Sequence, residues 1–85
     1  MNLTDVTYGQ LDRVLRSLGF TYQVLDKDPP VRVYEHKETG AEIRLPPFPD
    51  EDRVLEYHLV TAQVMLDEFG IADPTTFAAK LSKAG

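Results

Sequence analysis

The apolar residues near the start of the chain recur with the period of an α-helix. They lie at i, i+3, i+4 and i+7, a spacing that places them on one side of a helix. Thr7 and Gln10 stand just before them in the pattern of a capping box, in which each side chain bonds the other residue's backbone amide. Gly19 suits the left-handed conformation that ends many helices, and Phe20 is the apolar residue that often follows. We therefore predict a helix from about residue 7 to residue 18, with a buried stripe of Leu11, Val14, Leu15 and Leu18.

Between residues 20 and 45, apolar and polar residues alternate with the period of a β-strand. Prolines at the end of segment 26–30 and a turn at 37–40 divide this region into three short strands. Gly40 can adopt the positive φ that such a turn favours. Because the connections are short, we predict an antiparallel meander. The apolar positions of its strands are Phe20, Tyr22 and Val24, then Val31 and Val33, then Ala41, Ile43 and Leu45.

A longer helical pattern follows the proline-rich segment 46–49. Asp50, Glu51 and Asp52 form an acidic run that suits the partial positive charge at a helix N-terminus, so we expect the helix to begin there. Gly70, followed by Ile71, supplies the stop. The buried face of this helix is predicted to comprise Leu55, Leu59, Ala62, Leu66 and Phe69.

A short helix is predicted at the end of the chain. Asp73 and Pro74 have the order of a cap and a first-turn proline, and Phe77 and Leu81 follow at helical spacing. The complete pattern predicts an α+β fold in the order helix, strand, strand, strand, helix. Its three-stranded antiparallel sheet packs on two helices, and the short C-terminal helix is added to them.

The composition fits one small domain. With 85 residues there is room for a single hydrophobic core, so we assign residues 1–85 to one domain in which 1–6 and 82–85 fray. The absence of cysteine excludes disulfides and thiolate metal sites. The N-terminus lacks the pattern of a signal peptide, and no apolar run approaches the roughly 20 residues of a membrane helix. We expect a cytoplasmic protein without a membrane partner.

The charge balance bears on possible partners. The chain has 14 acidic and 9 basic residues and a net charge of −5. Nucleic-acid binding draws much of its affinity from cations that neutralise phosphates. A broad electrostatic contact with RNA or DNA is therefore disfavoured, which leaves only a local basic patch for such a role.

The order of elements resembles the double-stranded-RNA-binding-domain type of fold. Several local features narrow this resemblance. They are Leu18-Gly19-Phe20 after the first helix, Val33-Tyr34-Glu35-His36 in a strand, Gly40 in a turn, Leu45-Pro46 at a strand end, Phe69-Gly70-Ile71 after the long helix, and Phe77 with Leu81 in the last helix. By their order and spacing together, the chain resembles the HicA family of bacterial and archaeal toxins over roughly residues 7 to 81.

This resemblance implies an activity and a partner. HicA toxins cleave mRNA independently of the ribosome and are restrained by a HicB antitoxin that covers their active face. Their catalytic histidine belongs to a Gly-Ser-His-like motif at the start of the second strand. In this chain the matching stretch runs from Asp28 to Tyr34, and Val31 or Arg32 stands where the histidine is expected. The chain thus resembles HicA without the family's catalytic histidine, and it also lacks the family's basic charge.

His36 is the remaining weak candidate for proton transfer, because histidine titrates near neutral pH. It shares a strand face with Arg32 and Tyr34, and we expect Arg44 on the same face of the neighbouring strand. Such a set offers a base, cations for a phosphate and an aromatic ring for stacking, as RNA cleavage or binding requires. The simpler interpretation is that these residues form the solvated face of a half-covered sheet, with Arg44 paired to a nearby glutamate.

No other residues form a recognisable catalytic or metal site. The positions four residues before and after His58 are Val54 and Ala62, and neither binds metal. The acidic run at 50–52 could be the metal site of a nuclease, but the simpler interpretation is that these side chains complement the partial positive charge at a helix N-terminus. We therefore predict no metal and no cofactor.

Surplus apolar residues indicate a surface for a partner. Val60, Val64 and Met65 widen the apolar face of the long helix beyond what a sheet needs to cover, and Phe48 lies in the proline-rich loop before it. Exposed apolar surface on a helix often marks an interface. The equally favoured alternative is that the helical residues pack against the first and last helices.

Two functions follow from these observations. The first is a non-catalytic HicA-like domain that binds a protein, either a HicB-like antitoxin or a second copy of itself. The second is an atypical mRNA interferase of a HicA/HicB-type toxin–antitoxin system that uses His36 and its neighbours. The missing motif histidine and the acidic balance favour the first, and they disfavour RNA as a partner.

Overall fold

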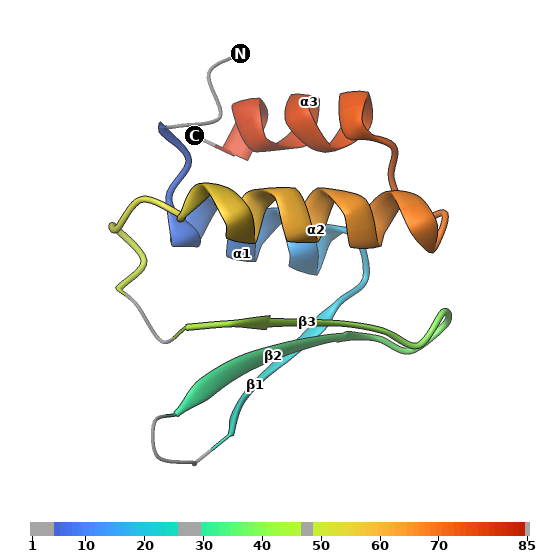
Figure 1. Ribbon diagram of the computed structural model, residues 1–85, viewed down its shortest axis with the longest axis horizontal. Coiled ribbons are helices and arrows are strands. Elements are labelled where there is room, and N and C mark those ends of the chain that lie inside the picture. Colours follow the sequence, from blue (N-terminus) through green and yellow to red (C-terminus); the bar gives the residue numbers. More distant parts are fainter. Residues whose placement is uncertain (1–4, 26–29, 47–48, 85) are drawn as a thin grey trace.

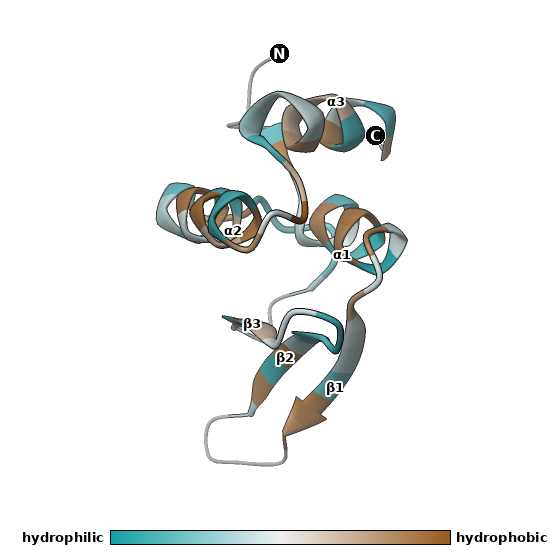
Figure 2. Cartoon of the chain, turned by 90° about the vertical axis from the view of Figure 1, so that its right-hand side faces the viewer, coloured by the Kyte–Doolittle hydropathy of each residue, from teal (hydrophilic) through white to brown (hydrophobic). Residues whose placement is uncertain are grey.

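The computed structural model describes residues 5–25, 30–46 and 49–84, and in this part of the chain it contains three helices and three strands (Figure 1). They are α1 (Tyr8–Ser17), β1 (Thr21–Leu25), β2 (Val31–His36), β3 (Ala41–Leu45), α2 (Glu56–Glu68) and α3 (Pro74–Ala84). Figure 2 shows α1 and α2 side by side between the sheet on one side and α3 on the other. The predicted α+β class and the order of the elements are confirmed.

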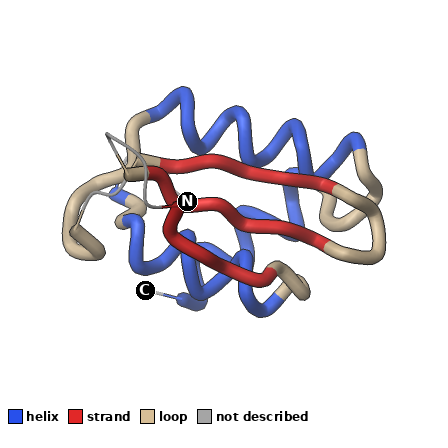
Figure 3. The backbone as a smooth tube through the Cα atoms, turned by 90° about the horizontal axis from the view of Figure 1, so that it is seen from below, coloured by secondary structure: helices blue, strands red, loops and turns tan. Residues whose placement is uncertain are grey.

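The sheet is an antiparallel meander with β2 in the centre. Tyr34 of β2 lies opposite Tyr22 of β1 and Ile43 of β3, so these three side chains share the face that the helices cover. The other face is turned away from the helices (Figure 3). The predicted inward face of β3 is confirmed, because Ala41, Ile43 and Leu45 are all buried.

The central strand has the opposite sidedness to the one expected. The register places Arg32, Tyr34 and His36 on the helix-covered face, while Val31 and Val33 face away from the helices. Tyr34 is fully buried and His36 is only 8% exposed, so the expectation of a solvated face is wrong. Tyrosine and histidine have large apolar bodies, and they can be buried when their polar tips find hydrogen-bond partners.

Helix α1 begins and ends as its sequence predicts. The Thr7 hydroxyl accepts a hydrogen bond from the Gln10 amide, and the Gln10 side chain accepts one from the Thr7 amide. Gly19 adopts a φ of +97° after the last turn. The ring of His36 lies so close that a Cβ added to Gly19 would be 3.3 Å from Nε2. Both the backbone conformation and the limited space favour glycine here.

Helix α2 begins at Glu56, later than predicted. The residues before it are held in an extended conformation by the N-terminal segment. The Val54 amide donates to the Val6 carbonyl at 2.8 Å, and Arg53 forms an antiparallel bridge with Thr7. Because these pairings require extended backbone, the helix starts only after them.

The acidic run before α2 caps the other helix. The carbonyls of Asp50 and Asp52 accept hydrogen bonds from the amides of Gly9 and Tyr8, at 2.9 and 3.0 Å. These amides belong to the first turn of α1, where helical partners are missing. The expectation that residues 50–52 open α2 is therefore wrong, since they bring their oxygens to the N-terminus of α1.

The C-terminal helix forms as predicted. The Asp73 carboxylate accepts a hydrogen bond from the Thr76 amide at 2.7 Å, and this bond lowers the pKa of Asp73. Phe77 and Leu81 are buried in the core, and α3 packs on α1 and α2. The last described turn of the chain thus completes the core.

The two ends of the described chain are more ordered than predicted. Of the segments predicted to fray, residues 1–4 and 85 lie outside the described residues. Val6 is buried and bonded to Val54, and α3 continues to Ala84.

Candidate functional site

The four residues predicted as a nucleic-acid site do not form one surface. Arg44 lies opposite Val33 on the face turned away from the helices, and its Nε is 2.9 Å from a carboxylate oxygen of Glu42. The other three candidates lie on the covered face. The expectation that Arg44 joins them is wrong, because the register places Ile43, not Arg44, opposite Tyr34. The predicted pairing of Arg44 with a neighbouring glutamate is confirmed.

Tyr34 and Arg32 form polar contacts that join the sheet to α1 and to the segment before α2. The Tyr34 hydroxyl donates to Oδ1 of Asp12 at 2.7 Å, and Nε of Arg16 donates to the same oxygen at 3.1 Å. Burial, followed by the bond to Asp12, raises the pKa of Tyr34, so its hydroxyl stays protonated and remains a donor. Nη1 of Arg32 lies 3.3 Å from Oδ1 of Asp50. These contacts give both side chains a structural role in the fold.

His36 is held by the turn between β2 and β3. Its Nδ1 lies 2.9 Å from Oγ1 of Thr39, and its ring packs against Phe20 with centroids 5.1 Å apart. A general base must reach the proton that it removes from a substrate. With one ring nitrogen bonded to the turn and the other against Gly19, this histidine presents little of its ring to a bound molecule.

His58 connects α2 to α1. Its Nδ1 lies 3.1 Å from the Tyr8 hydroxyl, which also accepts a hydrogen bond from the Leu55 amide at 3.4 Å. Its ring packs against Tyr57 with centroids 4.1 Å apart. Burial lowers the pKa of His58, which favours the neutral ring at neutral pH. The residue is therefore a structural link between the two helices.

The side of α2 turned away from the core carries exposed apolar residues. Leu59, Ala62 and Leu66 fill the core from one side of the helix. Leu55 and Phe69 were predicted on the same buried face, but they are 47% and 40% exposed, so that part of the prediction is wrong. On the other side, one line along the helix is formed by side chains exposed to 65%, 52% and 46%. We call this line the α2 outer face, and it consists of Tyr57, Val60 and Val64.

The predicted partner residues separate into three groups. Val60 and Val64 are exposed, so they do not pack against the neighbouring helices. Met65 is partly buried against the core, which is the packing alternative. Phe48 lies outside the described residues. Tyr57 was not among the predicted partner residues. It lies three residues before Val60 and seven before Val64, and this helical spacing places it on the same face of α2.

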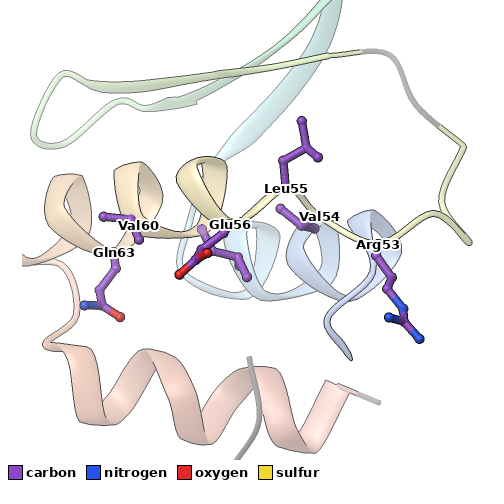
Figure 4. A pocket seen from close by; sticks show the side chains of 7 residues that line it. Arg53, Val54, Leu55, Glu56, Val60 and Gln63 are labelled. Atoms are coloured by element: carbon purple, nitrogen blue, oxygen red, sulfur yellow. The ribbon is translucent and has the colours of Figure 1, made fainter. Parts of the chain in front are cut away.

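A shallow apolar groove of about 290 Å³ runs beside this face (Figure 4). Val54 and Leu55 contribute to it from the extended segment, and Val60 contributes from α2. Figure 4 shows Gln63 pointing from α2 toward α3 at one end, with Arg53 at the other. A second hollow on the other side of Val60 also contacts Leu55, together with Tyr57 and Thr61. Val60 therefore stands between two depressions that a partner's side chains can fill.

Other kinds of site find little support in this structure. Within residues 5–25, 30–46 and 49–84, no three His, Cys, Asp or Glu side chains are grouped so that they could hold a metal ion. The helices of this part of the chain are too short or too polar to cross a bilayer.

No family model, curated protein or solved structure matches this chain. The resemblance to HicA toxins therefore remains a prediction carried by its residues, and the candidate surface on α2 rests on its own geometry.

Proposed function

We propose that this chain is a small, non-catalytic, HicA-like domain that binds another protein through the α2 outer face. The observation that supports the proposal is the exposure of three large apolar side chains in one line, on a helix whose opposite side already fills the core. Single exposed apolar residues are common on soluble proteins. A contiguous apolar surface next to a groove is more typical of an interface.

The energy available from this surface suits a modest association. Full burial of a valine or larger apolar side chain contributes about 1.5–3 kcal/mol. Three such side chains, with the adjoining Leu55, supply enough to offset part of the cost of association. Further polar contacts must then set the identity of the partner.

The resemblance to HicA toxins supplies one class of partner, a HicB-like antitoxin. The chain itself is acidic, which disfavours RNA as the ligand of this surface. A protein partner is thus the proposal that fits both the sequence and the exposed face.

The test compares two valines of nearly equal exposure. Val60→Glu places a charge in the α2 outer face, whereas Val24→Glu makes the same change on β1 at a residue that is 51% exposed. Tagged wild type and both variants are used for capture in the source cells, with quantitative mass spectrometry. We expect a protein that wild type and Val24→Glu recover equally and that Val60→Glu loses.

Affinity measurement with the purified captured protein completes the test. Val60→Glu and Val64→Glu are expected to weaken binding at least about tenfold, which corresponds to about 1.4 kcal/mol, while circular dichroism confirms that both variants are folded. Equal capture by wild type and both α2 variants would contradict the proposal.

Ribonuclease activity is the alternative function, and the positions of its candidate residues give it less support. His36 is largely buried and Arg44 lies on the other face of the sheet. Induced expression in a bacterial host, with growth and bulk mRNA followed, tests it directly. Growth arrest that His36→Ala relieves would favour an interferase over the binding module.

A further inference from the structure

Acidic side chains stand at both ends of the α2 outer face. Glu56 lies in the first turn of the helix, and Asp67 and Glu68 lie in the last. With 3.6 residues per turn, all three project from the same side of the helix as Val60. All are exposed. A rise of 1.5 Å per residue separates the two acidic ends by about 17 Å.

The helix dipole favours Glu56 in the first turn of α2, but the stability of the fold does not explain Asp67 and Glu68. Asp67 and Glu68 lie at the C-terminal end of the helix, where the partial negative charge of the backbone disfavours acidic side chains. The ion pairs of the described residues join Arg16, Arg32, Arg44 and Arg53 to other carboxylates, and none of them includes Glu56, Asp67 or Glu68. The helix has no lysine or arginine of its own. The acidic ends are therefore available to a basic partner.

The same charges disfavour a second copy as the occupant. If two α2 helices paired in antiparallel orientation, Glu56 of each would lie beside Asp67 and Glu68 of the other. In a parallel pair, each acidic group would face its own counterpart. Both arrangements bring like charges together without a basic residue between them, and such contacts select against a partner.

We infer that the α2 outer face binds an amphipathic helix whose apolar stripe carries lysine or arginine at both ends. This inference rests on the proposed function, because it names the chemistry of the protein that binds there. A helix suits the surface since the exposed line runs over consecutive turns and has depressions on both sides of Val60. Ridges of side chains from one helix pack into such depressions on another.

The test uses two synthetic helical peptides that differ only in charge. Both have the same leucine stripe and roughly 18 residues, enough to span the distance between the acidic ends. One carries lysines at the ends of the stripe and the other carries glutamates. Fluorescence anisotropy measures their binding to the full chain in about 50 mM and about 500 mM salt, because salt screens the charged contacts.

We expect the lysine peptide to bind at least about tenfold more tightly than the glutamate peptide in low salt, with a ratio that falls toward one in high salt. Glu56→Lys combined with Glu68→Lys should reverse this preference. Glu38→Lys combined with Glu42→Lys makes the same change in net charge at the turn and on β3, and should leave the preference largely intact.

The remaining outcomes separate this inference from the proposed function. If both peptides bind equally and Val60→Glu abolishes both, the face binds proteins but the inferred basic partner is wrong. If neither peptide binds, the inference fails, and cellular capture by wild type and Val60→Glu decides whether the function fails with it. A dimer in light scattering that Val64→Glu dissociates would overturn the inference in favour of a second copy.

Discussion

Helices α1 and α2 cover the same face of the sheet, but they use their apolar residues differently. In α1, Leu11, Val14 and Leu15 are all buried, and the solvent side is polar. In α2, a buried side that includes Leu66 is accompanied by the exposed outer face. The fold therefore accounts for the apolar pattern of α1 and for only half of that of α2. What the fold leaves unexplained in α2 is the part that indicates a function.

The two helices also differ at their N-termini. Helix α1 has a complete capping box at Thr7 and receives further acceptors from Asp50 and Asp52. Helix α2 has Leu55 at its N-cap, and this residue offers no side-chain hydrogen bond. A polar cap would stabilise α2, whereas Leu55 adds apolar surface to the groove. A leucine at this N-cap position is therefore consistent with a helix that contacts a partner on one side and the core on the other.

The largest expected effect separates the core of α1 from the outer face of α2. Leu15→Ala should lower the free energy of unfolding by about 2–5 kcal/mol, because it leaves a cavity at a fully buried position. Val64→Ala should change it by less than about 0.5 kcal/mol. Urea titrations followed by circular dichroism measure both. A loss above about 1.5 kcal/mol for Val64→Ala would show that the outer face supports the fold.

A smaller effect is expected from exchanging the caps. Thr7→Ala should lower the free energy of unfolding by about 1 kcal/mol, since it removes the acceptor for the Gln10 amide. Leu55→Ser should raise it by about 0.5 kcal/mol, since serine can accept an amide hydrogen bond at the start of α2. The same substitution should weaken partner binding. If Leu55→Ser destabilises the chain instead, Leu55 matters more for packing than for binding.

The smallest effect concerns pH. Because burial lowers the pKa of His58 in the folded state, the unfolded chain takes up the proton first as the pH falls through about 6.5. The contribution of His58 is therefore complete above pH 6.5 and declines toward the lower, folded pKa. His58→Gln should remove this part of the loss. Urea midpoints of the two proteins at pH 7.5 and 5.5 measure it, and parallel declines would mean that His58 titrates normally.

Local signals in the sequence predict most of the architecture. The capping box at Thr7, the glycine stops at Gly19 and Gly70, and the alternating face of β3 depend on residues close together in the chain. The failures depend on distant contacts. Tyr34 is turned inward where Asp12 offers an acceptor, and neither the pattern of β2 nor that of α1 reveals the pairing.

The candidate sites were predicted less well for a related reason. An apolar residue on a helix is buried or exposed according to what packs on it, so the sequence left Val60, Val64 and Met65 equally open to both roles. The structure exposes the two valines and partly buries the methionine. The grouping of Arg44 with His36 on one solvated face was wrong because the inward face of β2 cannot be read from a strand in which both faces contain large residues.

The pairing of segments 5–9 and 50–54 has a consequence for assembly on the ribosome. Helix α1 and the strands emerge early, but the first amides of α1 find their acceptors only when Asp50 and Asp52 have been made. The Val6 carbonyl likewise gains its hydrogen bond only when the Val54 amide has been made. The core then closes as α2 and α3 add their buried side chains. The outer face of α2 is therefore in place only after the segments on which α2 packs, and a partner that recognises this face meets a domain whose sheet and first helix are already made.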